Sequence, residues 1–481
     1  MPLLPSSPFL YSLVVSRYLR LLSLLSLFVL PFSSTTAATD PSSLAAPRPA
    51  TPPAKPNILV IIADDLGIGD IGFSGGKDFP TPHIDRLARE GASFTAGYLT
   101  APVCSPSRAG YLSGRYQQRF GHEFNPATGN VEQTGLPLTE KLLPARLREA
   151  GYHTALIGKW HLGTATEFQP LARGFDESPL GFLGGARDYE GEVRGPGRTL
   201  LKDGKPTPAK GYLTDQFGDE GVAFLQRQKS ASKPWFLWMA FNASHTPMDT
   251  TPEYMARVPA SVPADRRKLA AMTLALDDNI GKLLKALDAT SQAGNTLVVF
   301  TSDNGGAPAS NASNLHLRGF KGNTFEGGIR TAMAVRWPGV AKPGSTLAAP
   351  TNTLDLAATV LAAATGSVPK DYDGRDLAPA LAGKATLDPA RPLFWRMGTN
   401  WAIRSGDWKL VGGREGRGPS AKTHTLLVNL KSDPSEKTDL SAQHPDKRKE
   451  LEAAYKAWEK TLAQPLWKGG PGSGVGKEVG G

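Results

Sequence analysis

Groups that could bind a metal ion and a negatively charged ester recur along this chain, most of them directly after a short apolar run. Aspartate and asparagine oxygens are ligands for Ca²⁺ or Mg²⁺, and lysine and histidine can hold an oxyanion or transfer a proton. The metal-ligand candidates are Asp64, Asp65, Asp303 and Asn304, and the cationic or protonable candidates are Lys159, His161, His245 and Lys321. No group of Cys and His residues has the spacing of a zinc site. The set predicts metal-assisted chemistry on a tetrahedral oxyanion.

The single cysteine of the chain, Cys104, lies in the run Cys-Ser-Pro-Ser-Arg that ends at Arg108. One thiol can form no disulfide within the chain, and the ordinary fate of such a cysteine is to fill space in the core. The following proline and the run A-G-Y-L-S-G-R instead predict a turn into a helix start, where a side chain is presented to its surroundings. On this context alone, a chemical role for Cys104 and a place in the core are equally open, and the other candidate groups of the chain favour the chemical role.

A buried sheet is needed to bring these groups together. Continuous rather than alternating apolar runs indicate strands that are buried on both faces, and they lie at 57–63, 154–158, 235–241 and 296–301. Helices are predicted at 83–90, 138–150, 265–287, 354–364 and 377–381. The alternation predicts an α/β fold with a large, mostly parallel mixed sheet sandwiched by helices. Ligands of such sheets bind beyond the carboxyl ends of the strands, where the candidate groups follow.

The amino-terminal segment has the composition of an export signal. Residues 1–38 combine two arginines, a short apolar core at 21–32 and small residues before the expected cleavage site. The apolar core is too short to span a membrane, and no cysteine follows it to carry a lipid. We therefore expect an exported protein, periplasmic or secreted, without a stable membrane anchor.

The rest of the chain is too long for one simple core and is predicted to form a large and a small domain. The predicted order is a Pro- and Ala-rich linker at 39–55, a large domain at 56–384, a small α+β domain at 385–467 and a disordered Gly-rich tail at 468–481. A hairpin at 401–411, a strand at 426–430 and an amphipathic helix at 444–462 predict an antiparallel sheet in the small domain.

The charge of the chain restricts its partners. The formal charge is +10, which suits an anionic substrate and equally suits plain surface solubility. No cluster of lysine and arginine resembles a nucleic-acid-binding patch, so we expect no nucleic acid partner. The run 67–72 fits the G-x-G-x-x-G pattern of dinucleotide-binding folds. We reject that interpretation, because Asp64 and Asp65 directly before it would repel a pyrophosphate.

The chain resembles the type I, formylglycine-dependent sulfatases, which are arylsulfatase-like members of the alkaline-phosphatase-like superfamily. The resemblance covers nearly all of the chain after the predicted signal. It rests on the motifs N-I-L-V-I-I-A-D-D, T-P-H-I-D-R-L-A, C-S-P-S-R-A-G-Y-L-S-G-R, G-K-W-H-L-G, S-D-N-G, K-G-N-T-F-E-G-G-I-R, G-D-W-K-L and N-L-K-S-D-P-S-E, in this order. The C-x-P-x-R motif with the residues that follow it is the most specific of them.

The resemblance implies a cofactor, a modification and an activity. A formylglycine-generating enzyme would oxidise Cys104 in the unfolded chain, and the activity would be hydrolysis of a carbohydrate or aryl sulfate monoester by the hydrated aldehyde. Calcium is expected, with Mg²⁺ as the second choice, on Asp64, Asp65, Asp303, Asn304 and residue 104. The sulfate-handling residues would be Arg108, Lys159, His161, His245 and Lys321, with His245 and Lys321 protonating the leaving alcohol.

The part of the site that selects the substrate's alcohol is less defined. His122 and Asn125, just after the predicted catalytic helix, are expected on the rim of the site, and Arg187 and Asp188 are candidates in the loop region 163–211. Two alternatives to a sulfatase stay open. One is a phosphonate or phosphate ester hydrolase of the same superfamily, and the other is a non-catalytic protein that binds sulfated glycans.

Overall fold

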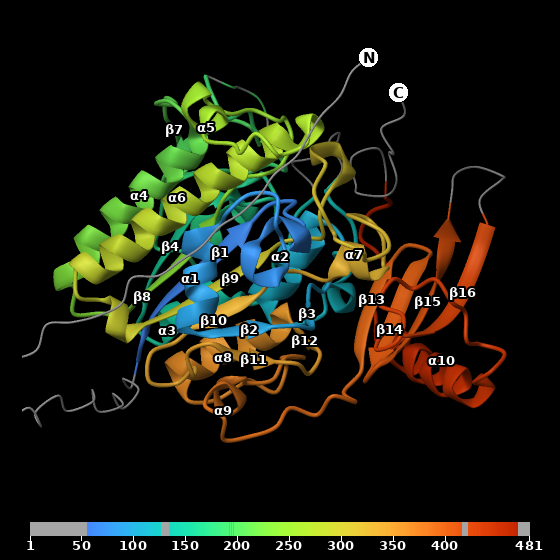
Figure 1. Cartoon of the computed structure of the whole chain (residues 1–481). Helices are drawn as coiled ribbons and strands as arrows, with labels where there is room; N and C mark the ends of the chain where they lie inside the picture. The colour runs from blue at the N-terminus through green and yellow to red at the C-terminus, as the bar shows by residue number, and fades with distance from the viewer. Residues whose placement is uncertain are drawn as a thin grey trace, which may run out of the picture. The chain divides into compact units, whose positions relative to one another are not determined.

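A ten-stranded mixed sheet forms the centre of the described chain (Figure 1). The computed structural model describes residues 55–126, 134–191, 193, 195, 197–415 and 422–469. The predicted signal peptide, nearly all of the predicted linker and the tail beyond residue 469 lie outside these ranges. No helix within the described ranges is long and apolar enough to cross a membrane.

The strand order in the large sheet is β11-β2-β10-β9-β1-β8-β4-β5-β6-β7. The central strands β9, β1, β8, β4 and β5 are parallel, and β10 runs antiparallel to β9 and β2. Their bounds are β1 Asn57–Ala63, β2 Ala92–Phe94, β4 His153–Lys159, β5 Glu177–Phe182, β6 Leu201–Lys202, β7 Lys205–Pro206, β8 Trp235–Ala240, β9 Thr296–Ser302, β10 Ala334–Arg336 and β11 Ser345–Leu347. The four predicted strands are β1, β4, β8 and β9.

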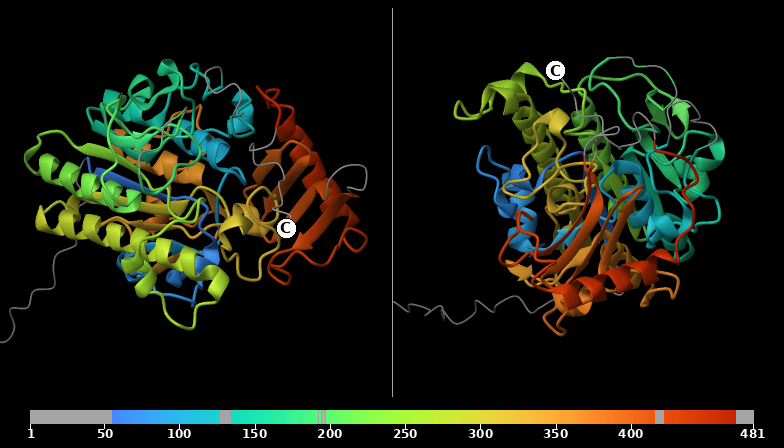
Figure 2. Two further views of the ribbon diagram at one scale, coloured as in Figure 1. Left: turned by 90° about the horizontal axis from the view of Figure 1, so that it is seen from above. Right: turned by 90° about the vertical axis from the view of Figure 1, so that its right-hand side faces the viewer.

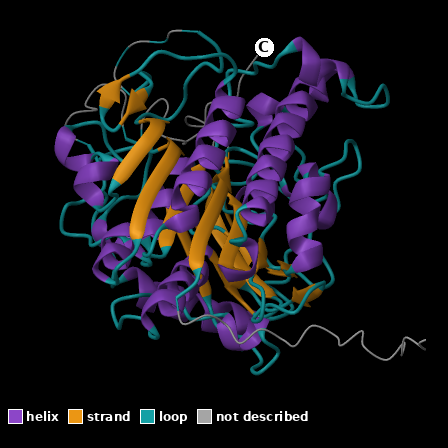
Figure 3. Ribbon diagram, turned by 90° about the vertical axis from the view of Figure 1, so that its left-hand side faces the viewer, coloured by secondary structure: helices purple, strands orange, loops and turns teal. Residues whose placement is uncertain are grey.

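Helices cover both faces of this sheet (Figure 3). Alternate residues of a strand point to opposite faces, and in the central strands the residues on both faces are apolar and need cover. In β1, Ile58, Val60 and Ile62 pack on one side, and Leu59 and Ile61 pack on the other. The first face packs against α2 Cys104–Ser113, α3 Leu143–Glu149 and α8 Thr353–Thr365. The second packs against α1 Pro82–Glu90, α4 Leu213–Arg227 and α6 Arg267–Ala289. Shorter elements are β3 Gly97–Tyr98, β12 Thr351–Asn352, α5 Pro252–Ala256, α7 Glu326–Ile329 and α9 Ala378–Leu381.

One predicted helix is shorter than expected. The sequence predicts a helix over 138–150, but α3 begins only at Leu143. Pro144 has no amide hydrogen and a fixed φ, so it favours the first turn of a helix over its interior. The residues before it form turns, and Leu138 is 57% exposed.

The C-terminal part forms a separate antiparallel sheet in the order β13-β14-β15-β16 (Figure 2). Its elements are β13 Leu393–Met397, β14 Asn400–Ser405, β15 Trp408–Glu415, β16 Lys422–Asn429 and the helix α10 Pro445–Glu459. Leu410 and Ile403 on one face pack against α10, and Trp395 and Val411 on the other face pack against Tyr98 of the large domain. The predicted fold class is therefore confirmed, including the hairpin, which is β14–β15.

Candidate active site

The polar residues that follow four strands of the large sheet come together at one edge. Because β1, β4, β8 and β9 are parallel, their carboxyl ends lie on the same side of the sheet. Asp64 and Asp65 follow β1, Lys159 ends β4, and Asp303 and Asn304 follow β9. All five side chains are buried, with residue exposures of 2% or less. Charges buried to this degree need partners or a bound ion.

Arg108 and Lys159 pair with two of these acids. The Lys159 ammonium lies 2.6 Å from Oδ2 of Asp64. Arg108 donates from Nε and Nη2 to Oδ2 of Asp303, at 2.9 and 2.8 Å, and from Nη1 to the backbone oxygen of Lys159 at 2.9 Å. Burial raises the pKa of the Asp303 carboxyl, but Arg108 and Lys159 outweigh it and hold the pKa below its ordinary value. The two cations are therefore fixed in place by these contacts.

The carboxylate of Asp65 contacts three further polar groups of the cluster. Its Oδ1 accepts from Nζ of Lys321 at 2.6 Å and from Nδ2 of Asn304 at 2.8 Å, and its Oδ2 lies 3.5 Å from Nε2 of His245. Burial alone would raise the pKa of Asp65, but the ammonium of Lys321 outweighs it and lowers that pKa. The sequence-distant groups Lys321 and His245 thus lie on one carboxylate.

Cys104 is the first residue of α2 and is 1% exposed. Its Sγ lies 3.8 Å from Oδ1 of Asp64 and 4.0 Å from Oδ1 of Asp65. Burial and then the negative charge of Asp303 raise the pKa of the thiol to about 12. Because the thiolate is the nucleophilic form of cysteine, the unmodified Cys104 is a poor nucleophile despite its central place.

The buried oxygens fit a hard divalent cation. Candidate ligand atoms of Asp64, Asp65, Cys104 and His245 all lie within 4.8 Å of one another. The Oδ1 atom of Asn304 is buried and has no hydrogen-bond partner within the described ranges, which is costly unless an ion or another group contacts it. Burial and the neighbouring Asp303 raise the pKa of Asp64 to about 8. A cation among these carboxylates would relieve that repulsion, and oxygen donors are what Ca²⁺ and Mg²⁺ prefer.

His161 lies at the edge of the cluster in a strained backbone conformation. Its φ of 62° is in the left-handed region, and its backbone nitrogen donates to the oxygen of Leu183 at 3.0 Å. Burial and the positive charge of Lys159 hold the pKa of the imidazole well below its ordinary value. Nδ1 of His161 is buried without a hydrogen-bond partner in the part of the chain that the structure describes. His161 is therefore a neutral group that can accept a proton.

Gly185 covers His161, and we expect its replacement to act on the imidazole. A Cβ at position 185 would lie 2.7 Å from Nε2 of His161. Gly185→Ala is therefore expected to displace the ring and to lower kcat by at least about 10-fold, with a change in Tm of less than about 2 °C. Steady-state kinetics and thermal unfolding of this variant and of Gly294→Ala test the expectation, since a Cβ at position 294 would meet nothing within 4 Å. Unchanged kcat in Gly185→Ala would show that the position of His161 does not matter.

The sequence predicted His122 and Asn125 on the rim of the site, but the structure buries both residues. They are 0% and 5% exposed and lie behind the start of α2. Nε2 of His122 lies 2.7 Å from the hydroxyl of Ser105, and Oδ1 of Asn125 accepts from the backbone nitrogen of Ser105 at 3.0 Å. The indole of Trp467 packs edge-on against His122. These contacts hold Ser105, the residue next to Cys104. A contact of His122 or Asn125 with substrate stays a prediction.

Arg187 and Asp188 make local contacts in their own loop. Arg187 is 1% exposed and donates from Nη1 to the backbone oxygen of Asp188 at 2.8 Å and from Nη2 to that of Gly191 at 3.1 Å. Asp188 pairs with Arg198 at 2.5 Å. The backbone oxygen of Arg187 also accepts from Nδ2 of Asn242, which follows β8, at 3.0 Å. A role of either side chain in binding substrate stays a prediction.

Sequence reasoning missed three residues that support the site. Ser105 links α2 to His122, Gly185 covers His161, and Tyr189 donates from its hydroxyl to the backbone oxygen of His245 at 2.9 Å. The only signal for the last two was their place in the G-G-A-R-D-Y run of the loop region 163–211. A Ser inside the C-x-P-x-R motif carries no signal, because the motif leaves that position open.

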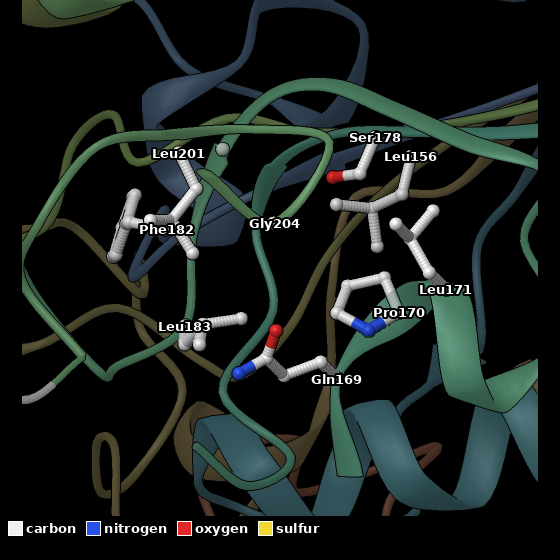
Figure 4. Close-up of a pocket in the computed structure, with 10 residues that line it drawn as sticks. Leu156, Gln169, Pro170, Leu171, Ser178, Phe182, Leu183, Leu201 and Gly204 are labelled. Carbon is white, nitrogen blue, oxygen red and sulfur yellow. The ribbon is translucent and has the colours of Figure 1, made fainter. Parts of the chain in front are cut away.

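A separate pocket lies against β4 and β5 and has a different character (Figure 4). It is lined by Leu156, Gln169, Pro170, Leu171, Ser178, Gly181, Phe182, Leu183, Leu201 and Gly204. None of these side chains is ionisable, so the pocket lacks groups for acid–base or metal chemistry.

The family model and two curated relatives that match this chain are all described as sulfatases. The family model described as Sulfatase matches residues 56–367. The N-acetylgalactosamine-6-sulfatase of Canis lupus familiaris is 35% identical over 74% of this chain and 72% of its own length. The steryl-sulfatase of Mus musculus is 33% identical over 84% and 82%. The crystal structure of Ps i-CgsB in complex with k-i-k-neocarrahexaose is 34% identical, with a TM-score of 0.81 over 88% of this chain and 96% of that chain.

Proposed function

This chain belongs to the sulfatase family and is a sulfuric ester hydrolase, and from that premise we propose that it cleaves a sulfate monoester of a carbohydrate, using formylglycine at position 104 and a bound Ca²⁺. One observation carries the proposal. Cys104 starts a buried helix beside Asp64 and Asp65, where burial raises the pKa of its thiol and disfavours the nucleophilic thiolate. A hydrated aldehyde at this position would supply the hydroxyl nucleophile that the thiol cannot. We include a formylglycine-generating enzyme as the partner that acts on Cys104 before folding.

The metal would be held by Asp64, Asp65, Asp303, Asn304 and the side chain of residue 104. Such an ion polarises sulfate oxygens and favours the deprotonated form of an attacking hydroxyl. The family resemblance and the unpartnered Oδ1 atom of Asn304 support this ligand set.

The remaining residues of the cluster would orient the ester and move protons. Arg108 and Lys159 are fixed by Asp303 and Asp64, and they would hold the sulfate in line with residue 104. The neutral His161 would accept a proton from the side chain of residue 104.

The leaving alcohol needs a proton when its bond to sulfur breaks. Lys321 is the candidate donor, because its ammonium lies 2.6 Å from Oδ1 of Asp65 within the cluster. Asp65 outweighs the effect of burial and raises the pKa of this ammonium, which therefore stays protonated and would donate to the departing oxygen. Burial lowers the pKa of His245 to about 4, and Nδ1 of its ring lies 2.6 Å from the backbone oxygen of Thr246, which can only accept a hydrogen bond. The neutral ring therefore carries its proton on Nδ1, and its Nε2 side would orient the leaving group beside Lys321.

A galactose-type sugar sulfate is our first choice of substrate. One relative is an N-acetylgalactosamine-6-sulfatase, and the solved relative with a TM-score of 0.81 is in complex with k-i-k-neocarrahexaose. Because another relative is a steryl-sulfatase, a sulfate ester of a non-sugar alcohol is the alternative substrate class. Export, predicted from residues 1–38, would bring the enzyme to polysaccharides outside the cell.

A screen of defined esters tests this proposal. Sulfate release would be measured on galactose and N-acetylgalactosamine sulfated at each hydroxyl in turn, on glucosamine sulfates, and on steryl and p-nitrophenyl sulfate. Matched p-nitrophenyl phosphate and phosphonate esters are the control. We expect kcat/KM to be highest on one galactose-type sulfate and at least about 100-fold lower on the phosphorus esters. A preference for the steryl ester or for a phosphorus ester would contradict the proposed substrate class.

A further inference from the structure

A buried ion cluster outside the active site joins the C-terminal sheet to α7. Nζ of Lys409 in β15 lies 3.0 Å from Oε1 of Glu326, the first residue of α7, and 2.8 Å from Oε1 of Glu436. The backbone nitrogen of Glu326 donates to Oε2 of Glu436 at 2.6 Å. All three side chains are 0% exposed. Buried ion pairs add little to stability compared with apolar packing, so a cluster of this kind suggests that geometry is being fixed.

Further contacts restrain Glu326. Its Oε2 accepts from the hydroxyl of Tyr98 at 2.6 Å, and Tyr98 itself accepts from Arg404 of β14. Burial would raise the pKa of Glu326, but Lys409 and Arg404 outweigh it and lower the pKa to about 2, so this carboxylate is ionised. The start of α7 is thus held by donors from β3 and β15.

The backbone of α7 in turn packs directly against the metal-ligand turn. The nitrogen of Gly305, the residue after Asn304, donates to the oxygen of Gly328 at 3.0 Å. A Cβ on Gly305 would lie only 2.0 Å from the oxygen of Gly327, so no side chain separates the two segments. A shift of α7 must therefore move the turn that carries Asn304.

The same short segment carries Lys321, five residues before Glu326 in the sequence. The backbone nitrogen of Lys321 donates to the oxygen of Gly306 at 3.2 Å, and that of Gly322 donates to the oxygen of Pro102 at 2.8 Å. Gly327 donates back to the oxygen of Arg318 at 2.7 Å, which closes the segment into a compact loop. Figures 1 and 2 show α7 beside the C-terminal sheet.

We propose that Glu326, Lys409 and Glu436 are positioning residues, through which the C-terminal sheet fixes α7 and thereby holds the ammonium of Lys321 against Asp65. The inference rests on the proposed role of Lys321 as proton donor to the leaving alcohol. A displacement of about 1 Å at a catalytic group can cost about 100-fold in rate. The loss should fall on esters whose alcohol is a poor leaving group, because these depend most on protonation.

The test compares two sulfate esters that the wild type accepts and that differ in their leaving groups, such as p-nitrophenyl sulfate and phenyl sulfate. The main variant is Lys409→Met with Glu326→Gln, which removes both charges of the pair. Glu436, whose pKa burial raises to about 7, can then take up a proton. We expect kcat to fall roughly 10- to 100-fold on the poor leaving group and less than about 3-fold on the good one.

Leu410→Ala is the matched control. Leu410 is the next residue of β15 and packs on the opposite face of the sheet, against α10. It is expected to lower Tm and to reduce kcat equally on both esters, as a merely structural change would. Glu436→Gln is a milder second variant that keeps an acceptor for the backbone nitrogen of Glu326. It is expected to shift the ratio of the two kcat values in the same direction by a smaller factor.

A double-mutant cycle with Lys321→Ala completes the test. In that background, the change at Lys409 and Glu326 should no longer alter the ratio of the two kcat values. The inference is overturned if the ratio is unchanged in the folded Lys409 and Glu436 variants, or if its change persists without the Lys321 ammonium. A folded, formylglycine-containing wild type that cleaves no sulfate ester would instead overturn the proposed function, and this inference with it.

Discussion

Replacing Cys104 by alanine is expected to lower kcat for sulfate-ester hydrolysis by at least about 10⁴-fold, the scale seen when an enzyme loses its nucleophile. Cys104→Ser should be nearly as damaging, because one hydroxyl on a saturated carbon cannot reproduce a hydrated aldehyde, from which sulfate can be expelled as the aldehyde re-forms. The side chain of residue 104 is buried among Asp64 and Asp65, and either replacement is small enough to fit there. Sulfate release and thermal unfolding of both variants are the measurements.

Ser107→Ala is the matched control for the Cys104 variants. Ser107 is buried in the same first turn of α2 and occupies an open position of the C-x-P-x-R motif. It should keep kcat within about 3-fold of the wild type, since it removes no group of the cluster. Full turnover by Cys104→Ser would contradict the proposed nucleophile.

Removal of divalent metal by a chelator is expected to lower kcat by at least about 100-fold, and added Ca²⁺ should restore it better than Mg²⁺. Without a cation, burial and then repulsion from the neighbouring carboxylates of Asp303 and Asp65 raise the pKa of Asp64. A cation at 100 times its Kd would stabilise the fold by about 2.7 kcal/mol. Thermal unfolding over a range of Ca²⁺ concentrations should therefore show a rising Tm.

Comparing Asp65→Asn with Asp70→Asn distinguishes the loss of a metal ligand from the loss of any buried carboxylate. Both aspartates are 2% exposed, but Asp70 pairs with Arg266 at 2.8 Å and lies outside the metal-ligand cluster. We expect the Ca²⁺-dependent rise in Tm to be lost in Asp65→Asn and kept in Asp70→Asn. A chelated wild type with full activity and a Tm that ignores Ca²⁺ would contradict the metal assignment.

The apolar runs of the sequence were sufficient to predict β1, β4, β8 and β9 but not their parallel neighbour β5, whose run E-S-P-L-G-F is not continuously apolar. Strands buried on both faces need long apolar runs, and β1, β4, β8 and β9 have them. The outer strands could not be predicted in this way. β2, β10 and β11 have three residues each, which is too short for a pattern to emerge.

The sequence predicted the groups at the strand ends but not how the loops dispose their side chains. His122 follows the helix that carries Cys104, and nothing in its neighbours distinguishes a side chain on the rim from one that turns back to Ser105. The ion cluster was also invisible, because Glu326 lies 83 residues from Lys409 and 110 from Glu436. Only the packing of the C-terminal sheet on α7 brings these charges together.

The most direct test of the account combines mass spectrometry with kinetics on the same samples. The tryptic peptide 90–108, which contains Cys104, would be analysed for an aldehyde in place of the thiol in preparations made with and without a formylglycine-generating enzyme. We predict that the initial rate of sulfate release is proportional to the aldehyde fraction and falls to zero when residue 104 is entirely cysteine. Full activity in a preparation whose peptide carries only the thiol would contradict the account.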